Sequence, residues 1–490
     1  MRPQSGQNHP LSEKHALDRV VVDLSQRAPE VAISEIAPWI DSLIGNGELD
    51  FSERARLLFA LDEASQRAAR LCIDLYLKAG SASPLERRRL WAIAHGYWAM
   101  VLDAYGELLV AQTVEGEMAE RGLIAQLAVR AMRAASNRAK WDAFRHGPID
   151  DAVWDRLNLA YRLASRAGVV QQPVRLRPDR DAVFTVEREY LRAIALHSVG
   201  LDQLDAERLE LASRLVHYVL PSLELGEAPV ATTLYWIDAA LALPPARLVQ
   251  MPQHAALPRF FGGVRAAKVL QEVLERVSAG DLPAEFVLLQ DAQGSLLISV
   301  LSHMIRLWSS AAPVRRHRRH PMPGRLLVVD GWERLIGRLS GEDTALPPRD
   351  WAIRDASLQG VGADAPSGDL EGVEIGSLLG MHSPDGDRWR IGAVRRLWRS
   401  SKGESQIGIE LLGDAPVSVL ADDGENRIQV VLLDPLKRGA PVRLVLPLSA
   451  QRGEQALFLL DQHRAFKLMP LPGRQFGLDH EIRAYLLVAA

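Results

Sequence analysis

The residues best suited to chemistry lie in two short polar motifs. The first follows a proline and contains Arg315, Arg316 and Arg319, with no lysine among its cations. A guanidinium group binds phosphate through two parallel hydrogen bonds, pairs with both acceptors on the outer edge of guanine and stacks on a flat base. Lysine supplies only a point charge, so the motif predicts a planar ligand that carries phosphate.

The second motif consists of Asp355, Ser357 and Gly360, spaced as Asp-x-Ser-x-x-Gly. A carboxylate can accept hydrogen bonds from the amide and amino groups of guanine, and a serine hydroxyl can donate or accept. A glycine leaves room for a ligand or another backbone to approach. The two motifs together predict one site that holds a phosphorylated purine from two sides.

The elements that must position these motifs are short β-strands. From Pro313 onward, Gly, Pro, Asp and short apolar runs replace the helical pattern, which is typical of antiparallel β-structure. Closure into a small barrel would remove the exposed strand edges. The expected strands span residues 325–329, 334–339, 351–354, 361–363, 377–382, 388–399 and 406–411.

With the closing stretch Ile407–Gly413, the two motifs resemble those of PilZ domains, the bacterial receptor modules for cyclic di-GMP. The resemblance covers about residues 313–415. It implies that Arg315 and Arg319 take phosphates and guanine edges and that Arg316 assists them. It also implies that the three residues of the second motif line the other side of the ligand.

The same resemblance implies a function. The chain would be a cyclic di-GMP effector with no enzymatic activity, which regulates motility, pili or exopolysaccharide through a protein partner. Ligand binding at the Arg loop would change how the helical part and the barrel are oriented, and the helical part would hold the partner. The stretch from Arg319 to Asp355 is somewhat long for the family, and residues 341–350 are the expected insertion.

The rest of the chain predicts a multidomain α + β fold. Residues 1–224 show apolar positions at helical spacing with short connections, which indicates an all-α bundle or irregular solenoid. Residues 225–312 indicate a mixed α/β connector that ends in an amphipathic helix. The barrel at 313–415 is followed by a small β-rich domain at 416–490, either a second barrel or an extension of the first.

Composition limits the remaining function classes. The chain has 490 residues, enough for two to four domains, and a formal net charge of −3, which argues against a nucleic-acid partner. Cys72 is the single cysteine, so no disulfide can form within the chain, as expected in a reducing cytoplasm. The polar N-terminus and the absence of a long apolar run indicate a cytoplasmic protein with no transmembrane segment. We expect no cofactor and no metal.

Three alternatives use the same residues differently. A PilZ-like scaffold would bind only protein, with a solvated Arg loop and Asp355 capping backbone amides. A nucleic-acid site on the Arg loop lacks interleaved aromatic residues. A metal hydrolase built on His317 and His320 lacks a nearby carboxylate cluster.

Overall fold

The structure is a computed structural model, and its residue contacts divide the chain into two compact units. One unit contains Met1–Arg145, Ile149–Leu201 and Ala206–Pro313, and the other contains His146–Pro148, Asp202–Asp205 and Val314–Ala490. The structure describes residues 9–80, 83–114, 120–176, 182–281, 283, 286, 293–309, 317–341, 346–370, 372–400, 404–448, 456–461 and 464–489.

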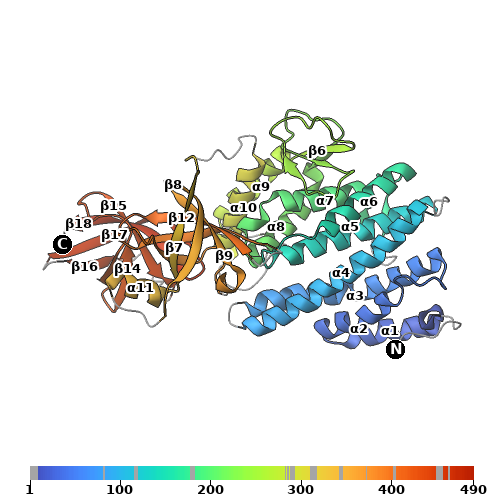
Figure 1. Ribbon diagram of the computed structural model, residues 1–490, viewed down its shortest axis with the longest axis horizontal. Helices are drawn as coiled ribbons and strands as arrows, with labels where there is room; N and C mark the ends of the chain where they lie inside the picture. Colours follow the sequence, from blue (N-terminus) through green and yellow to red (C-terminus); the bar gives the residue numbers. More distant parts are fainter. Residues whose placement is uncertain are drawn as a thin grey trace. The chain divides into compact units, whose positions relative to one another are not determined.

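Helices dominate the first unit, as the sequence pattern predicts (Figure 1). Successive helices pack on one another, and their buried side chains are mainly Ala, Leu, Ile and Val with several aromatic residues. The helices of this unit are α1 Lys14–Gln26, α2 Pro29–Asp41, α3 Phe51–Ala79, α4 Pro84–Val114, α5 Arg121–Ala143, α6 Asp151–Ala167, α7 Val186–Ser198, α8 Ala206–Val219, α9 Val264–Ser278 and α10 Gln293–Trp308.

Short polar residues and glycine set several helix ends. The Asp50 carboxylate accepts a hydrogen bond from the backbone amide of Glu53 at 2.8 Å, which satisfies a free donor in the first turn of α3. Gly168 adopts a left-handed conformation with φ of 68° directly after α6, a conformation that other residues adopt only with strain. These ends fix where the chain turns back on itself.

Two small sheets complete the first unit. Strands β1 Val174–Arg175 and β2 Val183–Phe184 pair with each other. A four-stranded sheet has the order β3-β6-β4-β5, and α9 and α10 follow it along the chain. Its strands are β3 Glu224–Gly226, β4 Tyr235–Asp238, β5 Ala246–Arg247 and β6 Pro258–Gly262.

The second unit begins with a closed six-stranded antiparallel barrel, which confirms the predicted barrel architecture. The strands follow the order β10-β11-β12-β9-β8-β7 around the barrel. Their inward residues form one apolar core that includes Trp351, Leu379 and Ile407. The strands are β7 His320–Asp330, β8 Arg349–Ser357, β9 Gly360–Pro366, β10 Leu378–His382, β11 Arg390–Arg399 and β12 Glu404–Gly413.

The strand expected at residues 334–339 is wrong, because this segment lies in helix α11, Trp332–Ser340. Its apolar residues recur at steps of three and four, and Leu335 and Leu339 pack in one hydrophobic cluster. An ion pair of 2.8 Å joins Arg334 to Asp330 one helical turn earlier. The helical period of the apolar residues therefore agrees with the helix that this segment forms.

The C-terminal stretch is a second closed six-stranded barrel, which settles the alternative left open by the sequence. The sequence pattern predicts strands at residues 427–433, 441–447, 456–460 and 482–488, which match β14, β15, β16 and β18, and it misses β13 and β17. One hydrophobic cluster combines Leu378 and Leu412 of the first barrel with Val431 and Val445 of the second. The strands are β13 Val417–Asp422, β14 Arg427–Leu432, β15 Pro441–Pro447, β16 Leu457–Asp461, β17 Arg464–Phe476 and β18 His480–Ala489.

Candidate ligand-binding site on the first barrel

A β-bulge in β8 sets the direction in which Asp355 points. Trp351 and Ile353 lie in the barrel core, so regular alternation would turn Asp355 inward as well. The register instead shifts between Ile353 and Asp355, which leaves Arg354 as an extra residue on this strand. Asp355 consequently lies opposite Gly362, whose two neighbours belong to the core, and points to the outer face of the barrel.

Strand pairing brings Arg319 to this carboxylate across 36 residues of sequence. Arg319 directly precedes β7, in which His320 and Pro321 pair with Ala356 and Asp355. Arg319 Nη1 donates a hydrogen bond to Asp355 Oδ1 at 2.5 Å. The two side chains are 28% and 21% exposed, so the pair lies at the surface, where a ligand can reach both groups.

Two glycines make room for side chains on the outer face of the barrel. A Cβ atom at Gly362 would lie 2.7 Å from Asp355 Oδ1 and 2.9 Å from Arg319 Nη1, too close for either group to stay in place. Gly408 on β12 pairs directly with Gly362, and a Cβ atom there would lie 3.1 Å from Cβ of Arg396. The side chains of Arg319, Asp355 and Arg396 therefore lie over these two glycines.

Ser357 and Gly360 shape the turn between β8 and β9. They pair with each other across the hairpin, and Ser357 Oγ donates to the carbonyl oxygen of Gly360 at 3.3 Å. A Cβ atom at Gly360 would lie 2.7 Å from the carbonyl oxygen of Ile409, so the glycine permits the close approach of β12. In this structure the hydroxyl and the glycine serve the hairpin, whereas the sequence assigned them to the ligand.

Arg354 is a second cation at the site, and sequence reasoning missed it. Its Nε lies 3.2 Å from Asp355 Oδ2 and its Nη1 lies 3.2 Å from Asp364 Oδ1. The two guanidinium groups of Arg319 and Arg354 thus face two carboxylates. A phosphate can bind here only if a guanidinium turns from its carboxylate toward the ligand.

The other predicted site residues are placed as follows. Arg315 and Arg316 lie outside the described residues. Arg318 is exposed and His317 is half-buried. Across the described parts of the chain, no group of three or more His, Cys, Asp or Glu residues could hold a metal ion. The metal-hydrolase alternative therefore gains no ligand set from these residues.

Comparison with known proteins bears on the helical unit. Residues 15–229 match a family model described as the N-terminal domain of the cyclic di-GMP receptor FimW. No curated protein matches the chain. Among the residues that the structure describes, no helix is long and apolar enough to cross a membrane. The family match supports a cyclic di-GMP receptor, and it lies entirely outside the barrel that carries the two polar motifs.

Proposed function

We propose that this chain is a non-enzymatic effector that binds cyclic di-GMP on the outer face of the first barrel. The observation that carries the proposal is the contact between Arg319 and Asp355 over Gly362 on the outer face of the barrel. A cation for phosphate and a carboxylate acceptor for guanine meet at one place. The match of residues 15–229 to a cyclic di-GMP receptor domain supports the same ligand.

Binding exchanges one set of partners for another. The Arg319–Asp355 pair is partly buried, so separating it costs more than the about 0.2–1 kcal/mol that a fully exposed ion pair contributes. A ligand phosphate would take the Arg319 guanidinium, and the released carboxylate would accept hydrogen bonds from guanine. Each charge-assisted hydrogen bond contributes about 1.5–3 kcal/mol, so several of them supply the roughly 8 kcal/mol of a micromolar complex. Arg315 and Arg316, which precede Arg319, would add further contacts to the ligand.

The output of this receptor is a change in a protein partner. A ligand shifts a conformational equilibrium only when it contacts the two states differently. Arg319 directly precedes β7, so a ligand that binds it acts on the chain where it enters the barrel. We propose that the helical unit holds the partner, in a pathway of motility, pili or exopolysaccharide.

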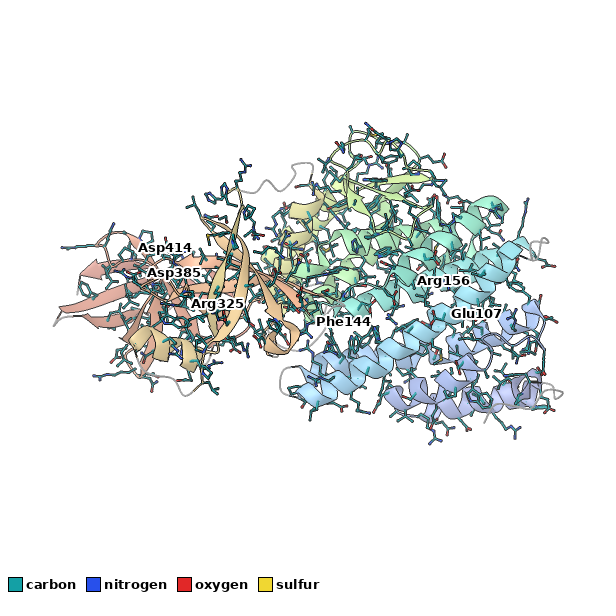
Figure 2. All side chains as sticks on the ribbon, viewed as in Figure 1. Glu107, Phe144, Arg156, Arg325, Asp385 and Asp414 are labelled. Atoms are coloured by element: carbon teal, nitrogen blue, oxygen red, sulfur yellow. The ribbon has the colours of Figure 1, made fainter. Side chains whose placement is uncertain are left out.

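Isothermal titration calorimetry with cyclic di-GMP tests the site. Arg319→Ala and Asp355→Ala should each weaken binding by about 10-fold to 100-fold, because each removes at least one charge-assisted hydrogen bond. The matched controls are Arg325→Ala and Asp350→Ala, which break an exposed Arg–Asp ion pair elsewhere on the same barrel (Figure 2 labels Arg325). Equal affinity in all four variants and the unaltered chain would reject the site.

One observation favours a second function, a scaffold that binds protein without nucleotide. Asp355 is already held by both Arg319 and Arg354, so the barrel face is internally satisfied. A scaffold predicts a flat calorimetric trace with cyclic di-GMP. It also predicts that the helical unit captures the same partner with and without the nucleotide.

A further inference from the structure

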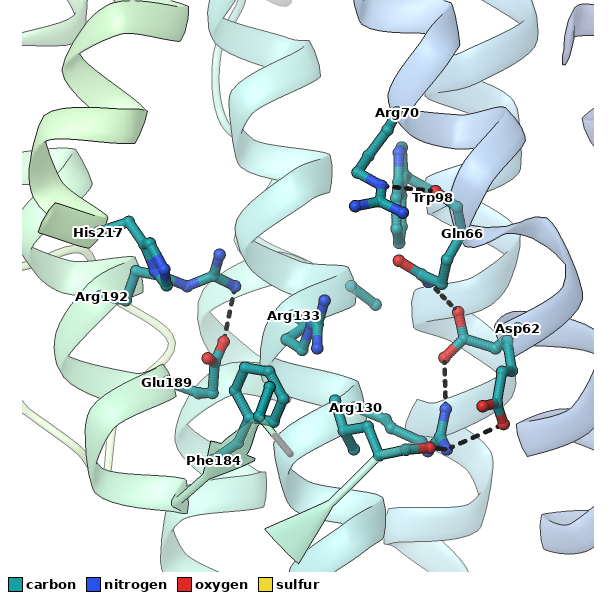
Figure 3. Close-up of a pocket in the computed structure, with 14 residues that line it drawn as sticks. Asp62, Gln66, Arg70, Trp98, Arg130, Arg133, Phe184, Glu189, Arg192 and His217 are labelled. Atoms are coloured by element: carbon teal, nitrogen blue, oxygen red, sulfur yellow. Dashed lines mark hydrogen bonds and ion pairs between the residues drawn. The ribbon is translucent and has the colours of Figure 1, made fainter. Parts of the chain in front are cut away.

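The helical unit contains a pocket that none of the predicted motifs touches. Its volume is about 350 Å³, at the lower end of the range for small-molecule sites in proteins. Residues of α3, α4, α5, α7 and α8 line it together with Phe184 of β2 (Figure 3). Trp98, Ala134 and Leu176 give it apolar walls, and several arginines give it charge.

Two of the four arginines that line the pocket are neutralised by nearby carboxylates. Arg130 lies 3.4 Å from Asp62 and 3.9 Å from Glu63, and it donates to the carbonyl oxygen of Leu176 at 2.8 Å. Arg192 Nη2 lies 2.6 Å from a carboxylate oxygen of Glu189. These two arginines have the partners that buried charge requires.

Arg70 and Arg133 differ from the other two. Arg70 donates from Nε to the carbonyl oxygen of Gln66 at 3.3 Å, and the Arg133 guanidinium lies over the Phe184 ring at 4.9 Å. Within the described part of the chain, neither has a carboxylate within ion-pair distance, and Figure 3 shows both guanidinium groups at the pocket. The pocket therefore contains two cations that lack an anion.

The surroundings of Arg133 disfavour its charged form through burial. Burial is the largest cause that lowers the pKa of Arg133; Glu189 and Asp62 raise this pKa, and Arg192 and Arg130 lower it. A cation in this position is stabilised when an anion enters.

The pKa of His217, on α8, is lowered as well. Burial lowers the pKa of His217, and Arg192 and Arg133 lower it further. A neutral imidazole beside two cations offers hydrogen-bonding groups to an anion without adding a negative charge.

We propose that this pocket binds a purine nucleotide. The phosphate would lie between Arg70 and Arg133, and the base would pack against the apolar walls formed by Trp98 and Phe184. Guanidinium groups bind phosphate bidentately, and aromatic rings accept a flat base on their faces. A volume of about 350 Å³ suits one nucleotide unit, either a free mononucleotide or one half of a cyclic dinucleotide. This site shares no residue with the barrel site.

The test uses the full chain with Arg319→Ala and Asp355→Ala already in place, so that binding at the barrel site is strongly weakened. Calorimetric titrations with GMP, cyclic di-GMP and inorganic phosphate then report on the helical unit. We expect GMP or cyclic di-GMP to bind more tightly than phosphate. We also expect at least a tenfold loss of that binding in Arg70→Ala and in Arg133→Ala.

Arg67→Ala is the matched control, because Arg67 is exposed on the same helix as Arg70 and does not line the pocket. Arg70 is itself exposed, so Arg70→Ala remains informative if Arg133→Ala fails to fold by circular dichroism. Binding of cyclic di-GMP without GMP would assign the pocket to half of the dinucleotide, and the reverse would assign it to a mononucleotide. The proposal fails if neither nucleotide binds, if phosphate binds as tightly as both, or if Arg70→Ala and Arg67→Ala behave alike.

Discussion

The barrel face and the helical pocket each contain arginine side chains, and the two places differ in the carboxylates that surround these arginines. On the barrel, Arg319 and Arg354 both contact Asp355 on an open strand surface. In the pocket, Arg70 and Arg133 lie in a concave site without a described carboxylate partner. The barrel must exchange one anion for another, whereas the pocket has cations ready for an anion. The number of arginines thus says less about a site than the carboxylates that the fold places beside them.

The largest expected effect is a loss of affinity at the barrel site. Gly362→Val should weaken cyclic di-GMP binding at the barrel by about 100-fold or more, because its side chain occupies the space of the Arg319–Asp355 contact. Calorimetry in an Arg70→Ala background, which weakens the pocket, measures this loss. Gly368→Val is the control, since a Cβ atom there meets nothing within 4 Å. Normal affinity in Gly362→Val would show that the ligand does not use this surface.

A second prediction separates the stability of the helical unit from that of the barrels. Burial lowers the pKa of His197 to about 4, and this ring lies edge-on to Trp154 at 4.9 Å. The unfolded chain binds a proton at this histidine near pH 6.5 and the folded chain does not, so stability falls as pH drops from about 6.5 to about 4. His197→Phe should remove about 3 kcal/mol of this loss, on the order of 100-fold in the unfolding constant.

Chemical denaturation followed by the helical circular dichroism signal at several pH values measures the change in stability. The control is His254→Phe, at an exposed histidine. A stability difference between His197→Phe and the unaltered chain that stays constant with pH would contradict the role assigned to His197.

The smallest expected effect is a difference in how strongly salt weakens ligand binding at the two sites. The distance over which exposed charges interact falls from about 10 Å at 0.1 M salt to about 3 Å at 1 M, and enclosed charges are screened less. Raising salt across this range should weaken cyclic di-GMP binding at the barrel by about fivefold and nucleotide binding in the pocket by about twofold. Titrations in the two single-site backgrounds supply both numbers. Equal salt dependence would mean that the pocket is as open to water as the barrel face.

Much of the fold follows from local patterns in the sequence. Turn residues and alternating apolar runs locate most strands of both barrels. The strand predicted at residues 334–339 was wrong because three apolar residues in so short a segment fit a strand and one helical face equally well. Strands β13 and β17 were not predicted because polar and apolar residues do not alternate regularly along them.

The sites were harder to foresee than the fold. The proximity of Arg319 and Asp355 could be predicted from the two motifs, because the strand that follows Arg319 pairs with the strand that contains Asp355. The bulge at Arg354 leaves no mark in the residue types, although the alternation of glycine with core residues around Gly362 was a readable signal. The helical pocket draws on residues from Asp62 to His217, so no local spacing could reveal it.

The hydrophobic cluster shared by the two barrels limits how this protein can be dissected. It combines Leu378, Ile391 and Leu412 with Val431 and Ile482, each almost completely shielded from water. A truncated chain that ended near residue 415 would expose the first three of these side chains to water. The exposed apolar surface would promote aggregation. A fusion protein that includes the first barrel should therefore include both barrels.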